Sequence, residues 1–443
     1  MIDTLVGFYA KSADAPPRDP DNEDVQQELR RRKWQVFFAI TFGYGFYYVC
    51  RLSINVAKPL MDEAGVFDAA ELGLIGSALY FSYAFGKLTN GVLADHVNQR
   101  RFMATGMFVS ALANLFLGFT TIFWVFILLW GINGWFQSFG AASSVRSISN
   151  WYAGEERGSI YGMWASSHNI GEAVTFVGTA IVVSYFGWMW GFRASGIVCL
   201  LASFYMLMHV HERPAAYGLP SPRTQQGETG FKALRQMQLE VIKTPAVWIV
   251  ALASASFYIT RYAVNSWGIY FLQDARGYST IEASSIVSVN AIAGIFGTFF
   301  SGILSDRLFQ RRRNIPSLVF GVVYAFATWL FFFGPANKWA EITAMVLFGL
   351  ALGALMVYLG GLIAVDICRK EVSGAALGVV GVASYIGAGV QDIISGRMIE
   401  DSKSIVNGVE VANFEAVGMF WLGSAIASII LALFVWNAKS PDD

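Results

Sequence analysis

The sequence predicts an all-α membrane protein with twelve transmembrane helices arranged as two pseudo-symmetric six-helix bundles. Hydrophobic residues make up 55% of the 443 residues and charged residues only 14%, whereas soluble domains carry about 25% charged residues. Apolar segments of spanning length recur twelve times along the chain, and motifs of the first half return in the second. A chain of this composition is expected to take the lipid bilayer as its solvent.

Each predicted span is a long apolar run of the kind that a transmembrane helix requires, about 20 residues. The runs are continuous and do not alternate apolar with polar residues, which favours helices over a membrane β-barrel. The spans of the first half are predicted at 34–57, 71–94, 102–121, 123–150, 158–184 and 188–209, and those of the second at 246–273, 281–305, 315–333, 340–366, 373–396 and 413–436.

Polar segments divide these spans into domains. The first 33 residues are Pro-containing and charged, and the first apolar run, from Trp34, is too long for the core of a signal peptide. The longest internal polar stretch contains three prolines and separates two sets of six spans. The predicted organisation is a leader at 1–33, an N-terminal bundle at 34–209, a linker at 210–244, a C-terminal bundle at 245–437 and a tail at 438–443.

Lysine and arginine gather in the even-numbered connections, which predicts that these connections face the cytoplasm. The odd-numbered connections contain few basic residues, namely Lys58, Arg276, Lys338 and Lys403. Both termini are therefore expected in the cytoplasm, as an even number of spans requires, and the expected location is a bacterial inner membrane.

The two halves are a sequence repeat. Gly91-Val-Leu-Ala-Asp95, followed by Arg100-Arg101, returns 211 positions later as Gly302-Ile-Leu-Ser-Asp306, followed by Arg311-Arg312. This element resembles the signature loop of the major facilitator superfamily, and parallel six-span repeats with a central site are typical of rocking transporters. The residues expected to gate the cytoplasmic mouth are Asp95, Arg101, Arg146, Asp306 and Arg312.

Two arginines lie inside predicted spans at equivalent positions of the repeat. Arg51 in the first span and Arg261 in the seventh are 210 positions apart. Insertion of one charged residue at the centre of a membrane helix costs about 2.5–3.5 kcal/mol, so such residues are functional by default. Two guanidiniums facing a shared cavity would clamp a tetrahedral dianion. The alternative is that each arginine forms a structural ion pair across the bundle.

Four further polar residues in the spans are candidates for the site. Lys87 adds positive charge near the site or extends to the membrane interface. His168 donates a hydrogen bond to a phosphate or serves only as a hydrogen-bonding core residue. Glu172 shares a helix face with His168 and is expected to hold the imidazole's orientation or charge. Asp392 accepts substrate hydroxyls or neutralises a basic group when the site is empty.

Tyrosines cluster in sequence around these basic residues. Their hydroxyls are suited to donate to phosphate oxygens, although a single membrane tyrosine is usually a packing or interfacial residue. The pocket tyrosines are predicted to be Tyr44, Tyr48, Tyr83, Tyr258, Tyr358 and Tyr385.

With these motifs the chain resembles the organophosphate:phosphate antiporter family, and within that family it is most similar to the hexose-phosphate transporter and sensor branch. The motifs are Gly43-Tyr44…Tyr48-Val-Cys-Arg51, Tyr83-Ala-Phe-Gly-Lys87, Ser167-His168-Asn169-Ile-Gly171 and Tyr258-Ile-Thr-Arg261-Tyr262. The resemblance implies that Arg51 and Arg261 bind the phosphoryl group with help from Lys87 and His168, and that the tyrosines line the pocket. Three positions depart from the family pattern and concern the organic half of the substrate: Leu52, Ala141 and Glu172.

The expected function is exchange of an organic phosphate, such as a hexose 6-phosphate, for inorganic phosphate by alternating access in a monomer. One rival is a membrane receptor that senses external hexose phosphate and signals to a kinase. Another is a proton-coupled anion symporter that uses His168, Glu172 and Asp392.

An enzyme, a cofactor and a metal site are not expected, because no nucleophile elbow, phosphate-cradling loop or metal-ligand cluster is present. The zero net charge argues against a nucleic-acid partner, and the three cysteines are interpreted as packing residues.

Overall fold

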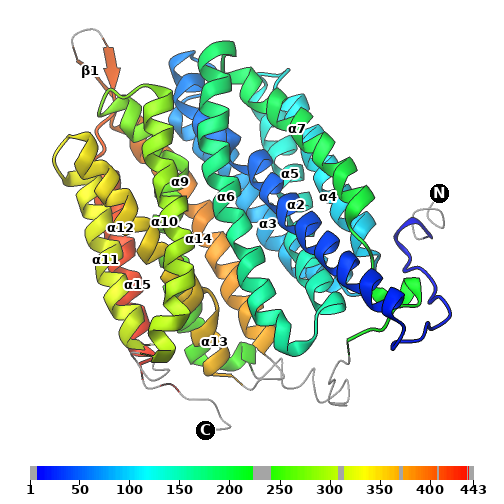
Figure 1. The fold of residues 1–443 in the computed structure, drawn as a ribbon. Coiled ribbons are helices and arrows are strands. Elements are labelled where there is room, and N and C mark those ends of the chain that lie inside the picture. Colours follow the sequence, from blue (N-terminus) through cyan, green and yellow to red (C-terminus); the bar gives the residue numbers. More distant parts are fainter. Residues whose placement is uncertain are drawn as a thin grey trace.

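The computed structural model is a bundle of long helices that run side by side (Figure 1). The structure describes residues 7–222, 241–307, 314–368, 373–406, 409–436 and 438. Ten helices in this part of the chain are long and apolar enough to cross a membrane. Two more long helices, α3 and α4, bring the long helices of the described part to twelve, in agreement with the predicted fold.

The N-terminal half contains six helices in the order that the apolar runs predict. They are α2 (Glu23–Glu63), α3 (Ala69–Ala94), α4 (Gln99–Leu117), α5 (Phe123–Trp151), α6 (Gly154–Phe186) and α7 (Trp188–His209). Helix α2 begins well before the apolar run, because Asn22 caps its first turn and Glu23 and Asp24 suit the positive end of the helix dipole. It also continues past the predicted end of the first span, which changes the environment of Lys58.

The C-terminal half repeats this arrangement. Its helices are α9 (Pro245–Asp274), α10 (Thr280–Arg307), α11 (Asn314–Phe333), α12 (Lys338–Val357), α14 (Ser373–Asp401) and α15 (Glu415–Phe434). Helix α12 continues through a π-helical turn, η2 (Tyr358–Leu362), into the short α13 (Ile363–Asp366). A small antiparallel hairpin, β1 (Ser404–Val406) and β2 (Val409–Val411), follows α14 and lies at the end of the bundle opposite both termini (Figure 1).

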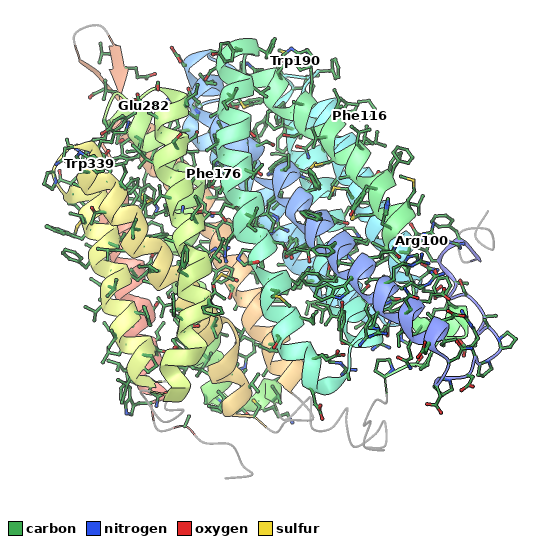
Figure 2. The ribbon with its side chains drawn as sticks, viewed as in Figure 1. Arg100, Phe116, Phe176, Trp190, Glu282 and Trp339 are labelled. Atoms are coloured by element: carbon green, nitrogen blue, oxygen red, sulfur yellow. The ribbon has the colours of Figure 1, made fainter. Side chains whose placement is uncertain are left out.

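The outer surface of the bundle is apolar, as a lipid-facing surface must be. Figure 2 shows Phe116 and Trp339 at the periphery, where they are 57% and 79% exposed, whereas Phe176 is fully buried. Polar side chains such as Asn114, Asn133 and Gln137 are buried inside the N-terminal half and donate to backbone carbonyls of α2. This distribution is the reverse of the one in a soluble protein.

The two halves contact each other mainly through α3 with α14, α6 with α10 and α2 with α9. Several polar contacts between the halves lie near the end of the bundle away from the termini. Lys403 pairs with Asp62 at 2.9 Å, Tyr270 donates to Asp62, and the Ala69 amide donates to Glu400 at 3.1 Å. We call this cluster, Asp62, Ala69, Tyr270, Glu400 and Lys403, the far-end lock.

The leader packs against the N-terminal half at the opposite end. The Tyr9 carbonyl accepts from the Asn98 amide at 2.9 Å, the Phe8 carbonyl accepts from Arg101 at 2.6 Å, and Lys11 donates to the Asp95 carbonyl at 2.5 Å. The leader therefore contacts both ends of the loop that joins α3 and α4.

The same leader also pairs with the first residues of the linker. The amides of Ala15 and Arg18 donate to the carbonyls of Ala215 and Gly218 at 3.0 and 2.9 Å. Ala215 lies within the single turn η1 (Pro214–Tyr217), and Gly218 directly follows it. The Ser12 amide donates to Glu212 at 3.1 Å. The first residues of the linker are thus fixed to the N-terminal half.

His211 connects this linker to α2. Its Nδ1 lies 3.2 Å from Arg32 Nη1 and 3.3 Å from the Tyr217 hydroxyl, and its Nε2 lies 3.1 Å from Gln35 Oε1. Burial, followed by the positive charge of Arg32, lowers the pKa of His211 to about 4. The folded protein therefore favours the neutral ring.

This depressed pKa predicts acid sensitivity at the linker. An unfolded histidine binds protons below about pH 6.5, so lowering the pH from 6.5 toward 4 favours the unfolded form, and the stabilisation is fully present only above pH 6.5. Thermal unfolding in detergent should show that the wild-type protein loses more stability over this range than His211→Gln, which cannot titrate. Equal losses in the two proteins would contradict the assignment.

Candidate functional site

Arg51 lies in the second half of α2 and is 3% exposed. Its guanidinium carbon is 5.1 Å from the Tyr48 ring centre and 4.3 Å from that of Tyr83 on α3. Its Nε and Nη1 atoms are buried and have no hydrogen-bond partner. Aromatic faces attract a cation, but they do not satisfy N–H donors, so this guanidinium retains donors for a ligand.

Arg261 occupies the equivalent position in α9 and is also 3% exposed. Its guanidinium carbon lies 5.4 Å from the ring centres of both Tyr258 and Tyr262. Nη1 contacts the Met356 sulfur at 2.9 Å, a weak acceptor, and Nε has no partner. The repeat has therefore placed two buried arginines in the same aromatic environment, one in each half.

Neither arginine takes part in an ion pair with a described residue. A buried charge without a partner is strongly unfavourable, so an anion bound beside either guanidinium would stabilise it. Tyr48 and His168 each lie close enough to interact electrostatically with both guanidiniums. The two arginines therefore belong to one electrostatic environment between the halves.

Tyr385 on α14 is the centre of an aromatic cluster that joins the halves. Its ring centre lies 4.4 Å from that of Tyr83, 5.6 Å from that of Tyr258 and 6.1 Å from that of Tyr262. The Lys87 ammonium lies 5.5 Å from the same ring, although the Lys87 side chain as a whole is exposed. Sequence reasoning left out Tyr80, whose ring lies 4.6 Å from that of Tyr262.

The α6 candidates lie close to the tyrosines of α2 and to α9. The His168 ring centre lies 5.7 Å from that of Tyr48, and Tyr44 packs against Trp164 at 4.8 Å. Glu172 is 3% exposed and accepts from Asn265 Nδ2 on α9 at 3.0 Å. The described hydrogen bond of Glu172 therefore crosses to the other half.

Tyr358 lies in η2, where its backbone enters the π-helical turn. It is fully buried and donates its hydroxyl to the Ser301 carbonyl of α10 at 2.6 Å. This bond connects two helices of the C-terminal half. Its contribution to substrate binding stays a prediction.

Asp392 forms a buried ion pair with Lys58. The ammonium lies 3.1 Å from Asp392 Oδ1, and both side chains are 0% exposed. Lys58 also donates to Ser266 at 2.6 Å, while Ser266 and Trp267 each donate to Asp392 at 2.7 Å. The carboxylate and ammonium are therefore hydrogen-bonded as well as paired, which a buried ion pair requires.

The placement of Lys58 in the connection after the first span was wrong. The rule of about 20 residues for a span ended the first span at 57, but α2 continues to Glu63 and keeps Lys58 inside the bundle. Gly76 of α3 makes the approach possible, because a Cβ at this position would collide with the Asp392 carboxylate. Lys58 (α2), Asp392 (α14), and Ser266 and Trp267 (α9) thus link the two halves, and we call them the buried latch.

The described gating candidates lie at the end of the bundle near the leader. Arg146 Nε lies 3.4 Å from Asp95 Oδ1, and Arg101 donates to the leader at Phe8. These contacts all lie within the N-terminal half. Arg312 lies outside the described residues, as does the side chain of Asp306.

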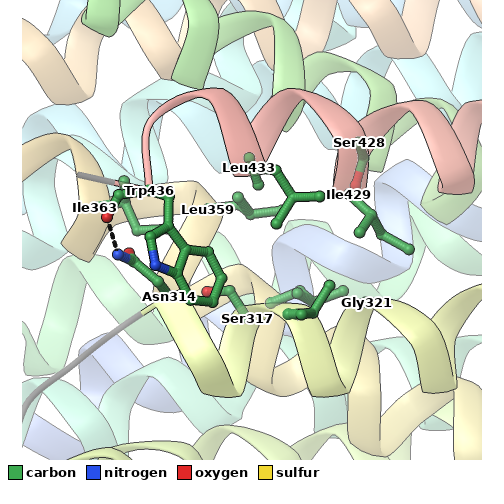
Figure 3. Close-up of a pocket in the computed structure, with 12 residues that line it drawn as sticks. Asn314, Ser317, Gly321, Leu359, Ile363, Ser428, Ile429, Leu433 and Trp436 are labelled. Atoms are coloured by element: carbon green, nitrogen blue, oxygen red, sulfur yellow. Dashed lines mark hydrogen bonds between the residues drawn. The ribbon is translucent and has the colours of Figure 1, made fainter. Parts of the chain in front are cut away.

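A small pocket lies apart from this site, between α11, α15 and η2 (Figure 3). Its lining is largely aliphatic, with Asn314 bonded to the Trp436 carbonyl at one end. No basic side chain lines it, so it offers nothing for a phosphate group.

Comparison with known proteins defines the class to which this fold and site belong. The Major Facilitator Superfamily profile matches residues 40–391, and the chain belongs to that superfamily. Its fold is similar to that of a bacterial homologue of the lysosomal transporter Spinster, solved in an inward-facing and unoccupied conformation, with a TM-score of 0.73 and 18% identity over 92% of this chain and 97% of that one.

Sequence relatives place the chain more narrowly. It is 30% identical to a probable hexose phosphate transport protein of Chlamydia muridarum over 96% of both chains. It is 28% identical to the membrane sensor protein UhpC of Salmonella typhimurium over 89% of this chain and 92% of that one. These matches confirm the resemblance to the organophosphate:phosphate antiporter branch, a group of multi-pass membrane transporters rather than enzymes.

Removing only one charge of the Lys58–Asp392 ion pair should destabilise the protein more than removing both charges. Lys58→Met leaves an uncompensated buried carboxylate and is expected to cost about 3–5 kcal/mol. The double variant Lys58→Met/Asp392→Asn should recover much of that loss, because no buried charge remains. Thermal unfolding of the single and double variants measures the coupling.

A matched comparison is Lys403→Met in the far-end lock. The Lys403 side chain is 8% exposed, but it lies among three carboxylates near the surface. Solvent screens that cluster, so its loss should be smaller than that of Lys58→Met. Additive losses in the Lys58 and Asp392 double variant would contradict the ion pair.

Proposed function

We propose that this protein exchanges an organic phosphate, most simply a hexose 6-phosphate, for inorganic phosphate by alternating access. The observation that supports the proposal is the pair of buried arginines, Arg51 and Arg261, one on each half, with unsatisfied donors and no ion-pair partner among the described residues. Their charges match those of a phosphate dianion, and each planar guanidinium can bind two of its oxygens.

Arg51 and Arg261 bind the phosphoryl group in this proposal, with Lys87 and His168 as further donors. The pocket around them consists of residues that lie against the arginines or against each other in the aromatic cluster, together with two carboxylates and one tyrosine of η2. These residues are Tyr44, Tyr48, Tyr83, Tyr258, Tyr385, Tyr358, Glu172 and Asp392. Asp95, Arg101, Arg146, Asp306 and Arg312 act at the mouth nearer the termini.

Exchange follows from electrostatics. A substrate that bridges Arg51 and Arg261 neutralises both halves at their interface and lowers the barrier to their relative motion. Without a dianion, the two like charges resist the intermediate in which the halves enclose the site. A ligand shifts such an equilibrium only by its difference in affinity between the states, and both phosphate and a phosphate ester can provide that difference.

The arrangement of the halves fits one state of this cycle. The far-end lock and the buried latch join the halves on the side away from the termini. With both termini in the cytoplasm of a bacterial cell and the chain in the inner membrane as a monomer, this is the state in which the outer side is closed. Opening that side requires both sets of contacts to break.

A receptor is the second candidate, because the relative UhpC carries the name of a sensor. The same arginine pair would then detect an external phosphate ester, and the conformational change would be read by a partner protein. Ligand binding without exchange would favour this function.

Proteoliposomes test the exchange directly. Uptake of labelled glucose 6-phosphate should require phosphate inside the vesicles. Arg51→Gln or Arg261→Gln should each reduce this uptake about 100-fold, because each removes charge-assisted hydrogen bonds worth roughly 1.5–3 kcal/mol apiece. Uptake that is equal with and without internal phosphate would refute exchange.

Arg193→Gln is the matched control. Arg193 is a partly buried arginine of α7 that donates to the Gly118 carbonyl at 2.7 Å and lies 4.2 Å from the Phe119 ring. This variant also removes one arginine from the N-terminal half, but it should leave exchange within about twofold of wild type, because Arg193 does not contact the proposed site. A loss as large as that of Arg51→Gln would show that the effect is not specific to the site.

A further inference from the structure

The repeat that carries the two arginines extends one helical turn further. Helix α2 contains Tyr48-x-x-Arg51-x-x-x-Asn55, and α9 contains Tyr258-x-x-Arg261-x-x-x-Asn265, with every equivalent pair 210 positions apart. Residues four apart share a helix face, so each asparagine lies on the same face as its arginine. Each lies on the side toward the buried latch, because α2 and α9 both run away from the end that carries the termini.

Both asparagines are buried and incompletely bonded. Asn55 and Asn265 are each 2% exposed. Asn55 Nδ2 and Asn265 Oδ1 have no hydrogen-bond partner, whereas Asn265 Nδ2 donates to Glu172 at 3.0 Å. A buried amide without a partner costs about 1–3 kcal/mol, so two equivalent unsatisfied amides beside the arginine pair indicate a position where a ligand completes the bonding.

Glu172 is the acidic residue of this layer. It reaches from α6 to Asn265 on α9, is 3% exposed, and takes part in no ion pair with a described residue. It lies close enough to Arg261 for electrostatic interaction. A carboxylate here accepts hydrogen bonds from hydroxyl groups and repels a second carboxylate on a ligand.

The chemistry of the layer matches a hydroxyl-rich group. A hydroxyl both donates and accepts, and the layer offers a free amide donor at Asn55, a free amide acceptor at Asn265 and the carboxylate of Glu172. An inorganic phosphate held by the arginines has no organic part to reach these groups. An ester extends one turn further along α2 and α9.

We propose that Asn55, Asn265 and Glu172 form a hydroxyl-recognition subsite beside the arginine pair, which selects phosphate esters with an uncharged polyhydroxyl group over esters that carry a carboxylate. This inference rests on the proposed phosphate site at Arg51 and Arg261. If Asn265 and Glu172 served only to link α6 and α9, substituting either residue would instead change the binding of all ligands alike.

Calorimetric titration of the purified full chain in detergent tests the subsite, since it reports binding whether the protein transports or senses. The ligands are inorganic phosphate, glucose 6-phosphate and 3-phosphoglycerate. Asn55→Ala and Asn265→Ala should each weaken glucose 6-phosphate binding about tenfold, as loss of a hydrogen bond implies, and leave phosphate affinity within about twofold. Glu172→Gln, which can still accept from Asn265, should narrow the preference for glucose 6-phosphate over 3-phosphoglycerate about tenfold or more.

Thr328→Val is the matched control. Thr328 is fully buried in α11, and its hydroxyl donates to the Tyr324 carbonyl of its own helix at 2.8 Å. Replacing this buried polar group should leave all three affinities unchanged. If the alanine variants do not fold, Asn55→Ser and Asn265→Ser replace them in the same titrations.

The outcomes distinguish a failure of the subsite from a failure of the proposed function. Equal weakening of phosphate and glucose 6-phosphate in the asparagine variants, or no weakening of either, would overturn the subsite and leave the phosphate site intact. A Glu172→Gln variant with unchanged discrimination would overturn the charge-selection step. A wild-type protein that binds none of the three ligands would overturn the proposed function, and the subsite with it.

Discussion

The structure depends on two positive charges that have been taken out of water and form no ion pair with a described residue. Arg51 and Arg261 are each surrounded by tyrosine rings, which attract the guanidinium but leave several donors unsatisfied. The rest of the bundle has to hold these charges between the halves, and the close helix pairs α2 with α9 and α3 with α14 provide that support.

The buried latch differs from the two arginines because its cation has an ion-pair partner. Lys58 lies seven residues after Arg51, and therefore on a similar face of α2, yet it is fully paired with Asp392 and hydrogen-bonded to Ser266. One helix thus carries a compensated cation and an uncompensated one, two turns apart. The compensated cation holds the halves together, whereas the uncompensated one is available to a mobile anion.

Much of the fold could be predicted from the sequence, because spanning helices follow from long apolar runs. The arginine positions were also predictable, since the repeat placed Arg51 and Arg261 at the same depth. The latch was not, because Lys58 stands at the edge of an apolar run and its partner Asp392 lies 334 residues away. Nothing in the local sequence indicates such a pairing, and the same holds for the bond between Glu172 and Asn265.

The leader was also beyond the reach of sequence patterns, because polar, proline-containing segments have no periodicity that predicts where they dock. In the structure it is hydrogen-bonded to the α3–α4 loop and to the start of the linker. The described part of the leader is therefore attached to the N-terminal half. A fluorescent label on this segment, paired with one on α11 or α15, would follow the angle between the two bundles and would not simply record the diffusion of a free tail.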